Sequence, residues 1–257
     1  MKPVLDPKKL PLGVGLLGVL GLVLRQLILA LATDSRGLLI SGHPLVIALL
    51  VLAAATAALV ALTVPGLGGG RKYAANFPPS ASAALGCGIL ALGLMVTAAL
   101  SLERSSLGYL RYGLGLASGS CLIFLAYARY RGINTNFLMH IVVCAFFAVH
   151  MVSRYRPWSG DPALLDYVFE VFAAVGLMLF AYHQAAFQLG RGKRRTQLFT
   201  GLLTGFCCLV CLPGCGAPLL YFGGAAWTLS NLCILTPPPR RKKVAPEAPR
   251  DDNHETS

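Results

Sequence analysis

Eight apolar stretches separated by short polar connections dominate the sequence, and most of the Lys and Arg residues gather in every second connection. Hydrophobic residues make up 56% of the chain and charged residues only 12%, with a mean hydropathy of +0.66. A soluble domain carries about 25% charged residues, whereas a surface that faces lipid needs none. The pattern therefore predicts an all-α, multi-pass bundle of about eight membrane-spanning helices.

Most of these stretches are long enough to cross a bilayer, which takes about 20 apolar residues. Three of them begin close to a proline, at Pro11, Pro44 and Pro162, and proline is favoured at the first position of a helix. We expect a single transmembrane domain over residues 1–235, with spans at residues 11–32, 44–64, 81–102, 107–128, 136–152, 162–187, 198–212 and 219–235.

The last apolar stretch, residues 198–235, is too long for one span. Its 38 residues would form a helix of roughly 57 Å, nearly twice the thickness of the bilayer core. Two prolines and two glycines interrupt it at residues 213–218, and this composition favours a turn. We expect two short helices joined by a tight hairpin, and the alternative is one span followed by a re-entrant segment.

The positive charges predict an orientation. With eight spans, the connections on the side of the N-terminus hold 16 of the 22 Lys and Arg residues, and the opposite connections hold four. Positively charged loops stay in the cytoplasm, so both termini are predicted to be cytoplasmic. Seven spans would place the basic residues 240–243 outside, against this rule. The preference for Arg over Lys and the abundance of Ala, Leu and Gly favour a bacterial plasma membrane.

The first span has an alternative interpretation. Lysines precede its apolar run, and small residues end it at positions 30–32, as in a cleaved signal peptide. Arg25 interrupts the run and the run is long, so a retained span is the favoured interpretation.

The C-terminal segment, residues 236–257, is polar and rich in proline, a composition typical of disorder. Basic side chains next to a membrane attract anionic lipids, so we expect such contacts from Arg240, Arg241, Lys242 and Lys243. The net charge of +12 is otherwise spread over the loops and forms no soluble basic face, so no nucleic-acid partner is expected.

Small residues predict where helices approach one another. Gly115 and Gly119 in the fourth span, and Gly201 and Gly205 in the seventh, have the four-residue spacing that permits close backbone contact. Glycines also recur every third residue at positions 15, 18 and 21. We expect these surfaces to pack within the bundle, and a homo-oligomer or a contact with another membrane protein is the alternative.

Ionisable residues inside spans are costly in lipid and usually face the protein interior. Arg25 and Glu170 lie roughly 11 and 12 Å from the outer ends of their predicted helices, and Arg111 and Asp166 lie roughly 6 Å from theirs. These matching depths predict an outer charged cluster in which Arg25 pairs with Glu170 and Arg111 with Asp166. The cluster is interpreted either as a site for a charged solute or coupled protons, or as a structural ion pair.

A second polar group is predicted on the cytoplasmic side. His140 and His183 lie at similar depths in neighbouring spans, together with Tyr127 and Gln184. Two histidines on different helices suit the axial ligation of a haem iron or a proton relay. Interfacial side chains that bind water and headgroups are the structural alternative.

Signals for other chemistry are weak. Four of the eight cysteines lie at positions 207, 208, 211 and 215, but they lie in an apolar helix, where thiols pack as small apolar groups. We therefore expect no metal site. The chain lacks the motifs of serine hydrolases, zinc proteases and nucleotide-binding folds.

The favoured function is therefore transport of a small solute or ion, since buried opposite charges suit that role. A membrane electron carrier with a bis-histidine haem is the first alternative, and a non-catalytic assembly partner is the second.

Overall fold

The computed structural model describes residues 9–33, 40, 42–67, 70–100, 104–158 and 167–235. Over these residues the chain forms helices and no β-sheet. Eight long helices are joined by short connections, and one connection contains the 3₁₀ turn η1 (Val64–Gly66) and the short helix α3 (Tyr73–Asn76). The long helices are α1 (Leu10–Leu31), α2 (Pro44–Thr63), α4 (Ala81–Leu100), α5 (Ser106–Arg131), α6 (Phe137–Trp158), α7 (Val168–Gln188), α8 (Arg194–Val210) and α9 (Pro218–Cys233).

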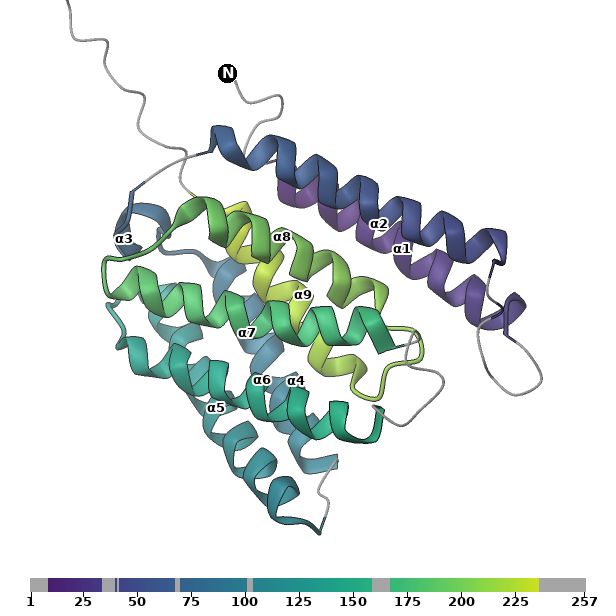
Figure 1. The fold of residues 1–257 in the computed structure, drawn as a ribbon. Helices are drawn as coiled ribbons and strands as arrows, with labels where there is room; N and C mark the ends of the chain where they lie inside the picture. Colours follow the sequence, from purple (N-terminus) through teal and green to yellow (C-terminus); the bar gives the residue numbers. More distant parts are fainter. Residues whose placement is uncertain are drawn as a thin grey trace, which may run out of the picture.

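Six of the long helices close into a ring. Helices α4 to α9 each pack on the next in chain order, and α9 returns to α4. Helix α1 packs against α8 and α9 from outside the ring, and α2 packs on α1 and α8 (Figure 1). The first two helices therefore form a separate hairpin laid over one side of a six-helix ring.

The fold is that of a helical membrane bundle. Helices α1, α2, α4, α5 and α7 and residues 137–154 of α6 are each long and apolar enough to cross a membrane. Large apolar side chains such as Leu16, Leu62 and Leu100 are exposed on the outer surfaces, where lipid would cover them. The prediction of a multi-pass helical bundle is therefore confirmed.

Helices α8 and α9 form an antiparallel hairpin around residues 211–217, in the stretch that is too long for a single span. They have 17 and 16 residues, so each extends over roughly 25 Å, slightly less than the hydrocarbon core. Helix α8 packs against α1, α7 and α9, and α9 packs against α4 and α8. Burial in protein compensates for their modest length.

Glycines set the closest helix contacts, and these lie within the bundle as expected. A Cβ atom at Gly115 would lie 2.6 Å from Ala98 of α4, and one at Gly205 would lie 2.7 Å from Leu229 of α9. Gly119 faces Met95, and Gly201 faces Phe180 of α7. Along α1, Gly18 and Gly21 face Leu209 and Val210 of α8.

The contact between α4 and α9 is closer still, because backbone meets backbone. A Cβ atom at Gly223 would lie 2.6 Å from the Cα of Leu90, and one at Gly86 would lie 2.7 Å from the carbonyl oxygen of Ala226. This contact closes the ring. The inside of the ring is filled by large buried side chains, among them Tyr221, Trp227, Phe146 and Phe180.

The bundle has two ends, which we name after a buried residue near each. The Glu170 end contains the start of α7 and the α8–α9 turn, and the Arg129 end contains the end of α5 and the start of α8. Because the long helices alternate in direction, Lys9 and Leu235 lie at the same end, the Arg129 end. Residues 162–166 of the expected sixth span and the basic residues 240–243 lie outside the described residues.

Candidate functional site: a polar cavity at the Glu170 end

Glu170 is the one acidic residue among the residues that the structure describes. It lies in the first turn of α7 and is only 3% exposed. The Tyr221 hydroxyl of α9 donates a hydrogen bond to Glu170 Oε1 at 3.2 Å, and Arg154 Nη2 of α6 forms an ion pair with the same oxygen at 3.6 Å. Three neighbouring helices thus hold one buried carboxylate.

Tyr221 extends this contact to a buried histidine. The tyrosine oxygen lies 3.4 Å from His150 Nε2, and the imidazole stacks on Phe146 with ring centroids 5.6 Å apart. Because the tyrosine donates its only proton to Glu170, it can accept one from His150. A continuous hydrogen-bonded chain therefore runs from His150 through Tyr221 to Glu170.

A cavity of about 120 Å³ opens beside Glu170, between α1, the start of α7 and the α8–α9 turn. Its lining includes Arg25 and Leu29 of α1, Phe169 of α7 and Cys215 of the turn. Arg25 is only 6% exposed. The sequence-predicted partners Arg25 and Glu170 thus line the same cavity, although the ion pair described for Glu170 is with Arg154. A direct Arg25–Glu170 pair stays a prediction.

Arg154 is a site residue that sequence reasoning missed. It lies beyond the predicted end of the fifth span at residue 152, but α6 continues to Trp158 and keeps Arg154 helical. Its guanidinium packs against Gly216 of the α8–α9 turn, where any side chain would overlap it. The available signal was the absence of Gly and Pro from residues 137–156, which permits a longer helix.

Arg111 joins the same region from the opposite side of the ring. It is 4% exposed, and its Nη1 donates a hydrogen bond to Ser153 Oγ at 3.2 Å. Ser153 in turn donates to the backbone carbonyl of His150 at 2.8 Å. Asp166, the predicted partner of Arg111, lies outside the described residues.

The cysteines near the cavity are free thiols. Cys211 and Cys215 donate hydrogen bonds to the carbonyl oxygens of Cys208 and Leu212, each at 3.3 Å. A hydrogen bond with Cys211 lowers the pKa of Cys215, which lies in the turn outside the helices. Among the described residues, no three His, Cys, Asp or Glu side chains are grouped in a way that could hold a metal ion.

The residues of the second predicted cluster have different surroundings at the Arg129 end. His140 is buried and approaches Tyr73, with ring centroids 6.4 Å apart. His183 lines a cavity of about 290 Å³ with Phe137 and Ile141 of α6. Tyr127 is 51% exposed and lies beneath the guanidinium of Arg131. Haem ligation by His140 and His183 stays a prediction.

Gln184, the remaining member of that cluster, is 1% exposed on α7. Helices α7 and α8 run antiparallel, and the contacts of Gly176 with Thr204 and of Gly201 with Phe180 place Gln184 opposite Gln197. Both side-chain amides are buried without a hydrogen-bond partner among the described residues. Buried amides of this kind commonly bind ordered water.

Two arginines that the sequence places in predicted connections at this end, Arg129 and Arg194, are buried. Arg129 is 6% exposed and lies over the rings of Tyr73 and Phe77, at 5.0 and 4.9 Å from their centroids. It donates hydrogen bonds to Asn231 and to the carbonyl oxygen of Phe77. Burial raises the pKa of the Tyr73 phenol, in the α2–α4 connection, to about 12.

The second of these arginines, Arg194, is 4% exposed and donates to Asn76 Oδ1 at 3.2 Å. Asn76 also donates to the carbonyl oxygens of Gly70 and Lys72, at 2.9 and 2.8 Å. Arg129 and Arg194 therefore attach the α2–α4 connection to the ring. Both arginines lie next to helix ends in the sequence. The sequence therefore could not show whether their side chains are buried in the bundle or exposed in a loop.

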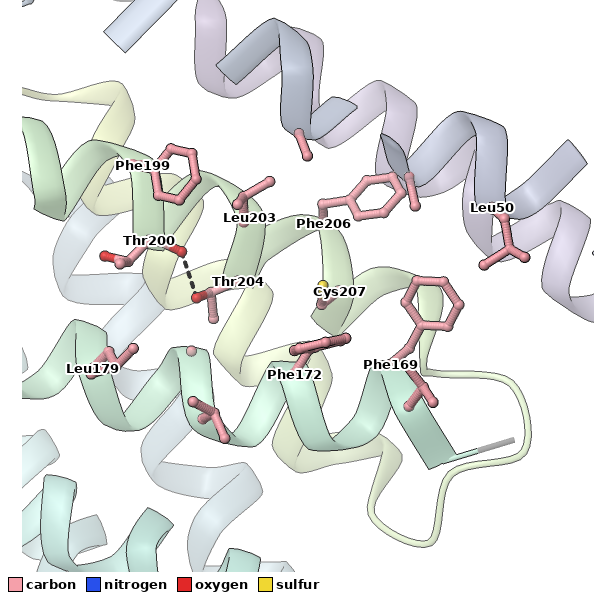
Figure 2. Close-up of a pocket in the computed structure, with 15 residues that line it drawn as sticks. Leu50, Phe169, Phe172, Leu179, Phe199, Thr200, Leu203, Thr204, Phe206 and Cys207 are labelled. Atoms are coloured by element: carbon pink, nitrogen blue, oxygen red, sulfur yellow. Dashed lines mark hydrogen bonds between the residues drawn. The ribbon is translucent and has the colours of Figure 1, made fainter. Parts of the chain in front are cut away.

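A larger, apolar groove of about 440 Å³ runs between α2, α7 and α8. Figure 2 shows the rings of Phe169, Phe172, Phe199 and Phe206 around it, with Leu50 of α2 on the opposite wall. Thr204 Oγ1 donates to the carbonyl oxygen of Thr200 at 2.6 Å, so this hydroxyl is satisfied within its own helix. The groove therefore offers an apolar surface.

Comparison with protein-family models, with curated proteins and with solved structures gave no match. We therefore infer function from the geometry of the Glu170 end.

Proposed function

We propose that the protein is a membrane carrier for a small anionic solute, in which Glu170 binds a coupled proton. The observation that carries the proposal is the position of Glu170, a buried carboxylate that lines a cavity together with Arg25 and ends a hydrogen-bonded chain from His150. Intramembrane ionisable groups with this geometry are typical of proton-coupled sites.

The chemistry of the two partners supports coupling. With Glu170 ionised, the carboxylate balances the charge of Arg154. With Glu170 protonated, the cavity that Glu170 and Arg25 line loses its negative charge, which favours an anion there. Proton binding and anion binding therefore favour each other, as linkage requires of coupled sites. His150 and Tyr221 provide the groups through which a proton can reach the carboxylate.

Orientation follows from the distribution of charge. The Arg129 end carries most of the basic residues in the connections, and such loops remain in the cytoplasm. We therefore place the Glu170 cavity on the outer side of the plasma membrane of a bacterium, with both termini inside. Buried polar groups at the opposite end, including Gln184 and Gln197, would then face the cytoplasmic half of a transport path.

The test is uptake of radiolabelled phosphate, succinate and glutamate into liposomes that contain the purified protein, with and without an inward proton gradient. These anions cross pure lipid slowly, so the protein-free background is low. The informative variant is Glu170→Gln, which keeps the shape of the side chain but cannot ionise. The matched control is Glu103→Gln, the same substitution in a predicted outer turn that lies outside the described residues.

We expect the wild type and Glu103→Gln to take up at least one anion faster when the outside is acidic. Glu170→Gln should lose this dependence on the proton gradient while it still elutes as a folded protein. Equal gradient dependence in Glu170→Gln and the wild type would make the Glu170–Arg154 pair purely structural. No uptake of the three anions above protein-free liposomes would exclude water-soluble anions as substrates. The carrier proposal as a whole would be overturned if, in addition, no anionic amphiphile bound saturably at the Glu170 cavity.

A further inference from the structure

We infer that the anionic solute is a single-chain amphiphile, whose headgroup occupies the cavity beside Glu170 while its hydrocarbon chain lies in the groove between α2, α7 and α8. The inference rests on the proposed function and names the substrate class of that site. Its support comes from the way the cavity and the groove adjoin.

The cavity and the groove share a wall. Phe169 lines both of them, and Glu170, the next residue of α7, faces the cavity. On α8, Cys207 lines the groove and Cys211, one helical turn further on, lines the cavity. A molecule that extends along the α7–α8 contact therefore passes from apolar to charged surroundings at Phe169.

The length of the groove fits one leaflet of a bilayer. Its lining on α7 extends from Val168 to Leu179, and the rise of eleven residues between them spans about 17 Å along the helix axis. The hydrocarbon core of a bilayer is about 30 Å thick, so the groove runs from the Glu170 end to about the midplane. One acyl chain of the leaflet on that side has the same depth.

The groove is accessible from the bilayer. Helix α8 forms its floor, because both α2 and α7 pack on α8. Three side chains at its rim, Leu50, Phe172 and Phe199, are 58%, 60% and 37% exposed. An amphiphile could therefore enter sideways from the lipid.

The charges at the end of the groove select an anion. Arg25 lines the cavity together with Glu170, and Arg154 forms an ion pair with the same carboxylate. Guanidinium groups form strong, charge-assisted hydrogen bonds with phosphate and carboxylate groups, so they favour such a headgroup in the cavity. An uncharged lipid would fill the groove equally well, but its headgroup would form no ion pair in the cavity.

The experiment is photolabelling of the protein in liposomes with lysophosphatidate that carries a photoreactive group at the middle of its chain. The monoacylglycerol with the same chain is the uncharged control, and labelled peptides are identified by mass spectrometry. We expect lysophosphatidate to label the α7 and α8 peptides that contain Phe172 and Leu203, both in the groove. Unlabelled lysophosphatidate or oleate should compete, and monoacylglycerol should not.

Two pairs of variants test the position of the chain. Ala53 and Ala57 of α2 line the groove, whereas their neighbours Ala54 and Ala58 are exposed outside it. Ala57→Phe should lower labelling about fivefold or more, because the new ring takes up the space of the chain, and Ala58→Phe should leave it unchanged. Ala53→Phe and Ala54→Phe repeat the comparison in case one variant fails to fold.

Arg25→Gln tests the headgroup. It should lower the preference for lysophosphatidate over monoacylglycerol about tenfold, because a charge-assisted hydrogen bond is lost. Equal, unsaturable labelling by the two lipids would show ordinary bilayer contact and overturn the inference, as would equal labelling of Ala57→Phe and Ala58→Phe. If uptake of the water-soluble anions still depends on Glu170 in that event, the carrier proposal stands and only the substrate class is wrong.

Discussion

The contact between α4 and α9 closes the six-helix ring, and it predicts that one substitution has opposite effects at two glycines. Gly223 of α9 faces the backbone of α4, and a Cβ atom added to it would lie only 2.6 Å from the Cα of Leu90. A Cβ atom added to Gly88 of α4 would have no neighbouring atom within 4 Å. We compare Gly223→Ala with Gly88→Ala.

The magnitude follows from two opposing effects. Replacing glycine by alanine inside a helix is worth up to about 1 kcal/mol in favour of the helix, and this gain is common to both sites. At Gly223 the new methyl group must push two backbones apart, and overpacking of this kind costs about 1–3 kcal/mol. Because the common gain cancels, Gly223→Ala should be less stable than Gly88→Ala by about 1–3 kcal/mol.

Thermal unfolding in one detergent, followed by size-exclusion chromatography after heating, measures the difference. For a chain of this size, about 2–4 °C of Tm corresponds to 1 kcal/mol, so Gly223→Ala should melt about 2–12 °C below Gly88→Ala. Both variants must be heated at the same rate, since irreversible unfolding makes Tm depend on the rate. Equal melting temperatures would refute the close approach of α4 and α9.

Three further predictions concern the polar groups. Tyr221→Phe removes the hydroxyl that contacts Glu170 and His150. The variant should have a free energy of unfolding about 1.5–3 kcal/mol lower, as for the loss of other hydrogen bonds to charged groups. An unchanged Tm would contradict this expected loss of stability. Cys211 lowers the pKa of the Cys215 thiol, so a larger fraction of this thiol is ionised at pH 7 in the wild type than in Cys211→Ala. An impermeant maleimide added to intact cells should therefore label Cys215 faster in the wild type, and the two labelling rates should converge above pH 9. No labelling of Cys215 from outside the cell would reverse the proposed orientation. If His140 and His183 ligate haem, the purified protein should have a Soret band, and the His140→Ala and His183→Ala variants should each lose it. A colourless wild-type preparation would refute haem ligation.

Much of the architecture could be predicted because hydropathy depends on composition along the chain. A run of about 20 apolar residues is favourable in lipid whichever way its side chains face, so the helical stretches were recognisable one at a time. The spacing of Gly115, Gly119, Gly201 and Gly205 likewise indicated close contacts, since only small residues permit them. Glu170 and Arg25 were singled out by their cost in lipid.

Only the tertiary structure decided which residues meet. The ion pair of Glu170 with Arg154 depends on where α6 ends and on how α6 is rotated about its own axis. The sequence of the connection between α6 and α7 determines neither the end of the helix nor its rotation. Arg129 and Arg194 are buried because the α2–α4 connection folds back over them, a long-range contact with no local signal. The groove beside α8 likewise exists because the α1–α2 hairpin lies outside a ring that α4 and α9 close. Sequence alone determined that the chain enters the membrane as helices, since transfer to lipid is a property of each segment; the site arises from packing between segments distant in the chain, which only the assembled bundle specifies.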